Sequence, residues 1–102
     1  MARLIDVPDA RACPPLLTVQ VGDVLHFHAI GGHVRSGSDV VEILGPFLTA
    51  VVGDDGNVFT PMGPPNTVFF RARAVGRAMV DVVVGPGLGM PVTRGLEISV
   101  AV

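Results

Sequence analysis

Hydrophobic and polar residues alternate along much of the chain, in short runs that are separated by Gly, Pro, Asn and Asp. Successive side chains of a β-strand point to opposite faces, so this alternation predicts strands that have one buried face. The clearest run spans Thr67–Val75. Its apolar face consists of Val68, Phe70, Ala72 and Ala74.

Further strands are predicted wherever a similar alternation, or a short apolar run, lies between turn residues. They span Arg3–Val7, Leu17–Val21, Val24–Ile30, Asp39–Leu44, Phe47–Val52, Arg77–Val84 and Leu96–Val102. Gly45-Pro46 is expected to separate two of them, and Asp54–Asn57 is expected to form a tight hairpin turn. The pattern predicts one all-β domain over residues 1–102, a β-sandwich of about seven to nine short, mostly antiparallel strands. A small closed barrel shares most of these signals.

The composition favours the same fold class. The chain has nineteen valines, 13 glycines and 9 prolines in 102 residues, and no tryptophan or tyrosine. Valine favours strands, whereas glycine and proline favour the turns between them. The formal net charge is −2 and the arginines are scattered, so the chain lacks the basic surface that nucleic-acid binding requires. We therefore expect no nucleic-acid partner.

The chain shows no signal for secretion or membrane insertion. Asp6 and Asp9 lie where a signal peptide would have its apolar core, so we expect a cytoplasmic protein. No apolar run is long enough to cross a membrane as a helix, and we expect no membrane partner. Only 16% of the residues are charged, and a small monomer could not bury all of Phe69, Val83, Met79, Val51 and Val40, which predicts an apolar surface that a second copy covers. A homodimer is therefore expected.

All three histidines lie in the stretch GDVLHFHAIGGH, Gly22–His33. Residues two apart share a face of a strand, so His26 and His28 point the same way, and a Gly31-Gly32 turn can fold His33 back beside them. Three imidazoles can bind zinc or copper and leave one position open. The alternative is an ordinary polar strand face. We expect no cofactor unless these three side chains hold such a metal.

Catalysis has little support in the sequence. Ser36 and Ser38 lie close to His33 and Asp39, but one loop cannot hold a nucleophile and its base at hydrogen-bonding distance. The only cysteine, Cys13, has no nearby histidine or lysine to activate its thiol. We therefore name no catalytic residue and expect a protein that is not an enzyme.

Three stretches resemble the chagasin-like family of cysteine-peptidase inhibitors. They are LTVQVGDVL (Leu17–Leu25), NTVFFRARAVGRAMVDV (Asn66–Val82) and LEISV (Leu96–Val100). The resemblance implies an immunoglobulin-like sandwich and inhibition through three loops at one end. The family carries an Asn-Pro-Thr-Thr-Gly motif in the first loop and Arg-Pro-Trp in the third. Here the corresponding stretches read GGHVRSGSD and GPGLGMPVTR, so no inhibitory residue is carried over.

Loops on a rigid sandwich are the usual place for recognition. The candidate loops are those around His33–Asp39, Pro61–Asn66 and Gly85–Thr93, with the first and third on the same side. The candidate binding residues are His33, Arg35, Asp39, Pro64, Pro65, Asn66, Leu88 and Met90. The leading hypothesis is a non-catalytic module that binds a protein partner or itself. A metal-binding domain that uses His26, His28 and His33 is the first alternative, and a divergent peptidase inhibitor is the second.

Overall fold

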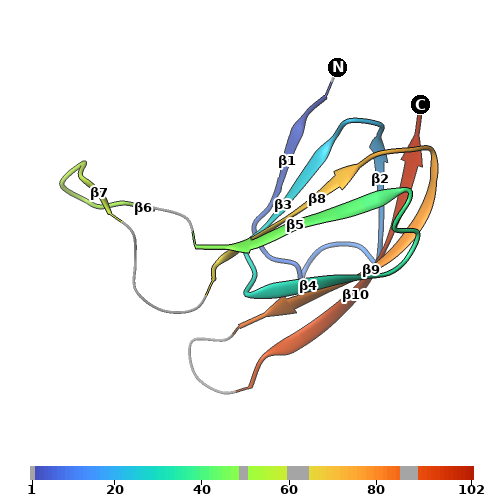
Figure 1. Cartoon of the computed structure of the whole chain (residues 1–102). Helices are drawn as coiled ribbons and strands as arrows, with labels where there is room; N and C mark the ends of the chain where they lie inside the picture. Colours follow the sequence, from blue (N-terminus) through green and yellow to red (C-terminus); the bar gives the residue numbers. More distant parts are fainter. Residues whose placement is uncertain (1, 49–50, 60–64, 86–89) are drawn as a thin grey trace.

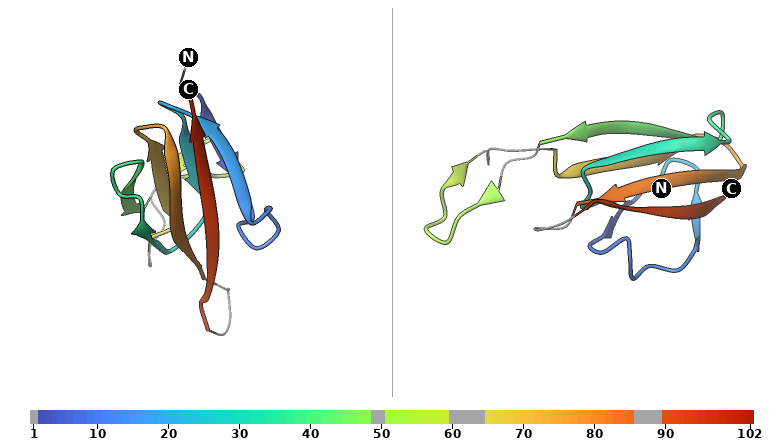
Figure 2. Two further views of the ribbon diagram at one scale, coloured as in Figure 1. Left: turned by 90° about the vertical axis from the view of Figure 1, so that its right-hand side faces the viewer. Right: turned by 90° about the horizontal axis from the view of Figure 1, so that it is seen from below.

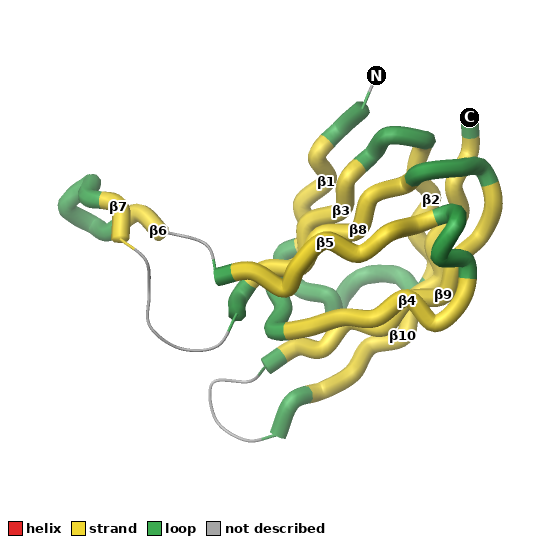
Figure 3. The backbone as a smooth tube through the Cα atoms, in the orientation of Figure 1, coloured by secondary structure: helices red, strands yellow, loops and turns green. Residues whose placement is uncertain are grey.

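The computed structural model describes residues 2–48, 51–59, 65–85 and 90–102, and these contain ten β-strands (Figures 1 and 3). The strands are β1 (Leu4–Val7), β2 (Leu16–Gln20), β3 (Val24–Phe27), β4 (Gly31–Ser36), β5 (Val41–Phe47), β6 (Val51–Val52), β7 (Val58–Phe59), β8 (Thr67–Ala72), β9 (Gly76–Val84) and β10 (Val92–Ala101). None of the described residues belongs to a helix that is long and apolar enough to traverse a membrane.

Eight of the strands form two four-stranded sheets that lie face to face (Figures 1 and 2). The first sheet has the order β1-β3-β8-β5, and the second has the order β2-β10-β9-β4. The pairings β1–β3 and β2–β10 are parallel, and the others are antiparallel. The remaining strands, β6 and β7, form a separate hairpin. The described strands thus form a sandwich-like arrangement, and the prediction of an all-β fold is confirmed.

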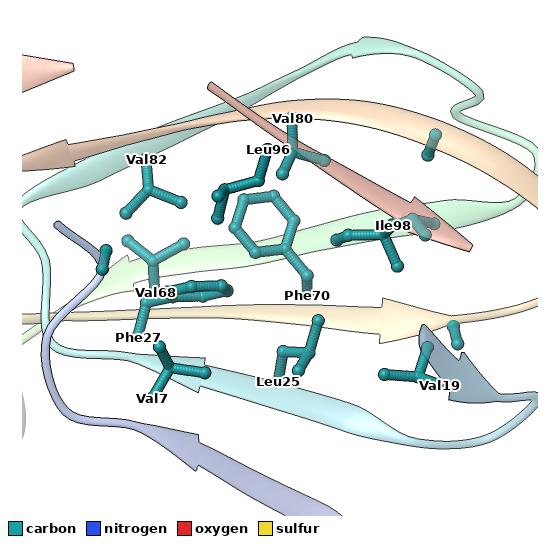
Figure 4. Close-up of a cluster of buried hydrophobic side chains, with 14 of the residues drawn as sticks. Val7, Val19, Leu25, Phe27, Val68, Phe70, Val80, Val82, Leu96 and Ile98 are labelled. Carbon is teal, nitrogen blue, oxygen red and sulfur yellow. The ribbon is translucent and has the colours of Figure 1, made fainter. Parts of the chain in front are cut away.

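The core lies between the two sheets, where apolar side chains from both inner faces meet (Figure 4). Phe27 on β3 and Phe70 on β8 pack edge to face, with ring centroids 5.6 Å apart. Around these two rings lie Val7, Val19, Leu25, Val68, Val80, Val82, Leu96 and Ile98. The predicted inner face of β8 is confirmed for Val68, Phe70 and Ala72. Ala74 lies beyond the strand and is exposed, so its predicted burial is wrong.

Some predicted strand boundaries are also wrong. Val24–Ile30 ends as a strand at Phe27, and Gly45-Pro46 does not separate two strands but lies inside β5. The pairing of β5 with β8 shifts register between Leu44 and Phe47, which accommodates the proline without a turn. The predicted hairpin turn at Asp54–Asn57 is confirmed, because the Gly53 N–H donates to the Asn57 carbonyl across it.

The strand registers place the connections at two opposite ends of the sandwich. We call one end the loop end. There β3 leads into β4, β5 ends at Phe47 beside Thr67 of β8, and β9 ends at Val84 beside Val92 of β10. At the terminal end lie the β2–β3, β4–β5 and β8–β9 turns. Both chain termini lie at that end as well (Figure 1).

Asp23 forms hydrogen bonds that hold Arg3, just before β1, at the terminal end of the sandwich. Its buried carboxylate accepts hydrogen bonds from the Arg3 backbone N–H at 3.0 Å, the Arg3 guanidinium at 2.7 Å and the Gln20 backbone N–H at 2.9 Å. The Arg3 side chain, followed by the Gln20 N–H, lowers the pKa of Asp23 to about 2. All these interactions favour the ionised carboxylate, so β1 is held in place by a charged group.

Replacing Asp23 by Asn is expected to lower the Tm at neutral pH on the order of 10 °C, because charge-assisted hydrogen bonds are lost. The Asp23 pKa is lower in the folded chain than in the unfolded chain, so the charge stabilises above about pH 4. That stabilisation is lost as the pH falls towards about 2. Thermal melts of both proteins at several pH values should therefore converge in acid. A Tm difference that does not change with pH would contradict this role.

Candidate functional site

Two of the three histidines lie together on the outer face of the first sheet. Leu25 and Phe27 of β3 point into the core, so His26 points outward between them, and His28 follows directly after the strand. The parallel edge strand β1 lies beside β3 and places Asp6 opposite His26. The sequence does not predict that Asp6 belongs to this site, because its position beside the histidines depends on a pairing between distant segments.

The Asp6 carboxylate lies between the two imidazoles. Its Oδ1 atom lies 3.1 Å from His26 Nδ1 and 2.9 Å from His28 Nε2. The imidazole rings are 4.6 Å apart, and His26 also stacks on Phe69 of β8 at 4.9 Å. The side chains of His26, His28 and Asp6 are 23%, 51% and 56% exposed. The three groups, which we call the Asp6 cluster, offer donor atoms within 4.8 Å of one another.

His33 does not belong to this cluster, so the predicted group of three histidines is wrong. Gly31 and Gly32 do not form a turn. They begin β4, and the Ile30 N–H donates to the Val83 carbonyl of the second sheet. His33 therefore lies opposite Asp81, in the sheet across the sandwich from His26. Gly32 allows close packing between the sheets, because a Cβ there would lie 3.1 Å from the Phe70 ring and from the Asp81 carbonyl oxygen.

The predicted binding residues do not form one surface. His33 and Arg35 lie on β4 and not in a loop, and Arg35 pairs with Asp81 at 3.0 Å. Asp39 lies in the β4–β5 turn at the terminal end. Pro65 and Asn66 precede β8 and Met90 precedes β10, all at the loop end. Pro64 and Leu88 lie outside the described residues. The expected side-by-side placement of the first and third loops is therefore wrong.

The loop end carries exposed apolar side chains. Met90 is 84% exposed, and the β6–β7 hairpin extends away from the sandwich at this end (Figure 1). Exposed apolar residues of the segments at this end, the projecting hairpin included, are Phe47, Leu48, Val52, Val58, Met90 and Val92. Of these, only Met90 was among the predicted binding residues. Phe47, Leu48 and Val52 belong to a predicted strand, where alternation alone does not indicate such exposure. Val58 directly follows the predicted Asp54–Asn57 turn, and Val92 lies within the predicted loop Gly85–Thr93.

The outer faces of the sheets are polar by comparison. Arg71 pairs with Glu42 on the first sheet, and Arg77 lies 3.6 Å from Glu97 on the second. A shallow depression at the terminal end is lined by Val21, Gly22, Arg71, Ala72 and Arg73. The Glu42 carboxylate pairs with Arg71 and lies 3.9 Å from Arg73, so it offsets part of the positive charge of this depression.

No family model matches the chain, and no curated protein matches its sequence. Among solved structures, the chain is similar to the one titled "Solution Structure of Amebosin", with a TM-score of 0.50. The match has 11% sequence identity and covers 99% of each chain. At that identity, the similarity concerns the fold alone.

Proposed function

We propose that the chain is a non-catalytic binding module whose loop end contacts a second copy of itself. The observation that carries this proposal is the distribution of exposed apolar residues. Of the eleven large hydrophobic side chains that are exposed among the described residues, six belong to segments at the loop end. Removing apolar side chains of this kind from water by contact with a partner lowers the free energy and so favours binding.

The fold supports the proposal. We infer an immunoglobulin-like arrangement, because the orders β1-β3-β8-β5 and β10-β9-β4 correspond to the two sheets of such a sandwich. In this arrangement β2 is an additional edge strand beside β10. The chains of such sandwiches present loops at both ends, and recognition by end loops is common among them. Among the described residues, the loop end carries more exposed large hydrophobic side chains than the terminal end.

The test is the mass of the protein in solution, measured by sedimentation and light scattering from micromolar to millimolar concentration. We expect twice the monomer mass of 10.6 kDa. Met90→Asp and Phe47→Asp should each weaken the dimer at least ~10-fold, because each places a charge in the contact. The matched control is Val75→Asp, which changes an exposed valine of the terminal end. A monomer at millimolar concentration, or equal effects of all three variants, would contradict the proposal.

A second candidate function is inhibition of papain-like cysteine peptidases. It is favoured by the placement of the β3–β4, β5–β8 and β9–β10 connections at one end, together with the resemblance of three stretches to the chagasin-like family. An assay against papain decides it. Micromolar inhibition that Met90→Asp abolishes would support it, and no inhibition at that concentration would dispose of it.

A further inference from the structure

We propose that the Asp6 cluster binds one divalent transition-metal ion, with Zn²⁺ the ion that best suits its ligands. This site lies on the outer face of the first sheet, and its three residues are none of the exposed apolar residues on which the proposed function rests. Two imidazole nitrogens and one carboxylate oxygen are a donor set that zinc uses in proteins. These atoms come from Asp6, His26 and His28.

The spacing of the donor atoms fits an ion. Neighbouring donors of a tetrahedral zinc ion lie about 3.3 Å apart, given metal–ligand distances of about 2.0–2.1 Å. The Asp6 Oδ1 atom lies 2.9 Å and 3.1 Å from the two imidazole nitrogens. The two imidazole nitrogens lie within 4.8 Å of each other. An ion therefore needs the carboxylate oxygen to move slightly outward and the two nitrogens to come to about 3.3 Å from each other. The half-exposed His28 and Asp6 side chains can make that movement without disturbing the core.

The cluster is also held in place by its surroundings. The neighbours of His26 in the strand, Leu25 and Phe27, are buried and fix the direction of its side chain. Stacking on Phe69 then fixes the plane of the His26 ring. The parallel pairing of β1 with β3 positions Asp6. Ligands on strands that are held in this way lose little freedom when an ion binds.

Hydrogen bonding alone is the competing explanation for the cluster. A single carboxylate oxygen can accept a proton from each imidazole, and exposed pairs of this kind contribute little stability. In that case each imidazole must carry a proton on the nitrogen that faces Asp6. A metal ion needs both nitrogens without that proton, so the two explanations predict different responses to added zinc.

Three protein ligands leave at least one coordination position for an outside molecule. Structural zinc sites are normally closed by four protein ligands, whereas sites with three keep water or another ligand in the open position. The exposure of His28 and Asp6 places that open position on the solvent side. The ligand class that it would accept is a small donor such as water, imidazole or a carboxylate.

The test is titration of chelator-treated protein with Zn²⁺ in a calorimeter, using protein that carries no histidine tag. We expect one ion per chain. His28→Ala and Asp6→Asn should each weaken binding by ~100-fold or more, since each removes a ligand. His33→Ala is the matched control, because it removes the histidine of the opposite sheet, and it should bind zinc as the unchanged protein does.

Thermal melts give an independent readout. An ion that binds only the folded chain raises the Tm, and we expect a rise of about 10 °C at a zinc concentration of about 100 times the Kd. The rise should be absent in His28→Ala and present in His33→Ala. No heat and no Tm change up to millimolar zinc would overturn the proposal, as would binding that survives His28→Ala or is lost in His33→Ala. Met90→Asp should leave zinc binding intact, so this result is independent of self-association.

Discussion

Phe70→Ala is expected to destabilise the protein by about 3–5 kcal/mol, the usual cost of removing a buried aromatic ring. Phe70 has no exposed surface and packs edge to face against Phe27 at the centre of the core. Because domains of this size are stable by only about 5–15 kcal/mol, the variant should melt roughly 20 °C lower or fail to fold at all. Urea denaturation and thermal melts followed by circular dichroism would measure the change.

Phe69 provides the matched control for this prediction. It is the preceding residue of the same strand, but its ring lies on the outer face against His26 and Phe47. Phe69→Ala therefore removes the same number of atoms without opening a cavity in the core, and it should cost about 1 kcal/mol. Equal losses from the two variants would mean that the two faces of β8 are assigned wrongly.

Gly37→Ala is the second substitution with a large expected effect. Gly37 has a φ of 81°, which non-glycine residues rarely adopt, and a Cβ there would lie 2.6 Å from the Arg77 carbonyl oxygen. The obstruction is backbone from β9, so no side chain can move aside. Strain and overlap together should cost about 2–5 kcal/mol, measured as the loss of unfolding free energy in urea.

Gly56→Ala separates these two contributions. Gly56 has a nearly identical φ of 84°, but nothing lies within 4 Å of its Cβ position. The substitution should therefore cost only the backbone strain, about 1 kcal/mol. If Gly37→Ala were no worse than Gly56→Ala, the close approach between the β4–β5 turn and β9 would be refuted.

The sequence predicts the strands well where burial on one face decides the structure. In β8 and β9, the two-residue period of the strand correctly indicates which side chains fill the core, namely Val68, Phe70 and Ala72 in β8 and Val80, Val82 and Val84 in β9. The sequence pattern predicts less where the structure depends on how the strands pair with one another. Gly45-Pro46 has the composition of a turn, yet the ladder to β8 continues on both sides of it with a shift in register.

The candidate sites depend on contacts between segments far apart in the sequence, so the sequence predicts them only in part. His26 and His28 share a face because they are two residues apart, and that part of the prediction holds. Asp6 joins them through the β1–β3 pairing, for which no local pattern gives the register. His33 lies outside the Asp6 cluster because Gly31 and Gly32 begin strand β4 and do not form a turn. The loop end was predicted in part, since Pro65, Asn66 and Met90 lie there. The exposure of Phe47 and Val52 was not predicted, because it depends on which residues remain uncovered after folding.

The position of the two chain termini has a practical consequence for experiments on this protein. Both emerge at the terminal end, where Arg3 pairs with Asp23, on the side of the sandwich away from the β6–β7 hairpin (Figures 1 and 2). A linker at either terminus can therefore attach the protein to a sensor chip with its apolar loops facing the solution. Two copies immobilised on one surface in this way point their loops in the same direction and cannot meet through them. Immobilisation thus presents single copies to a soluble partner, even if the protein associates with itself in solution at high concentration.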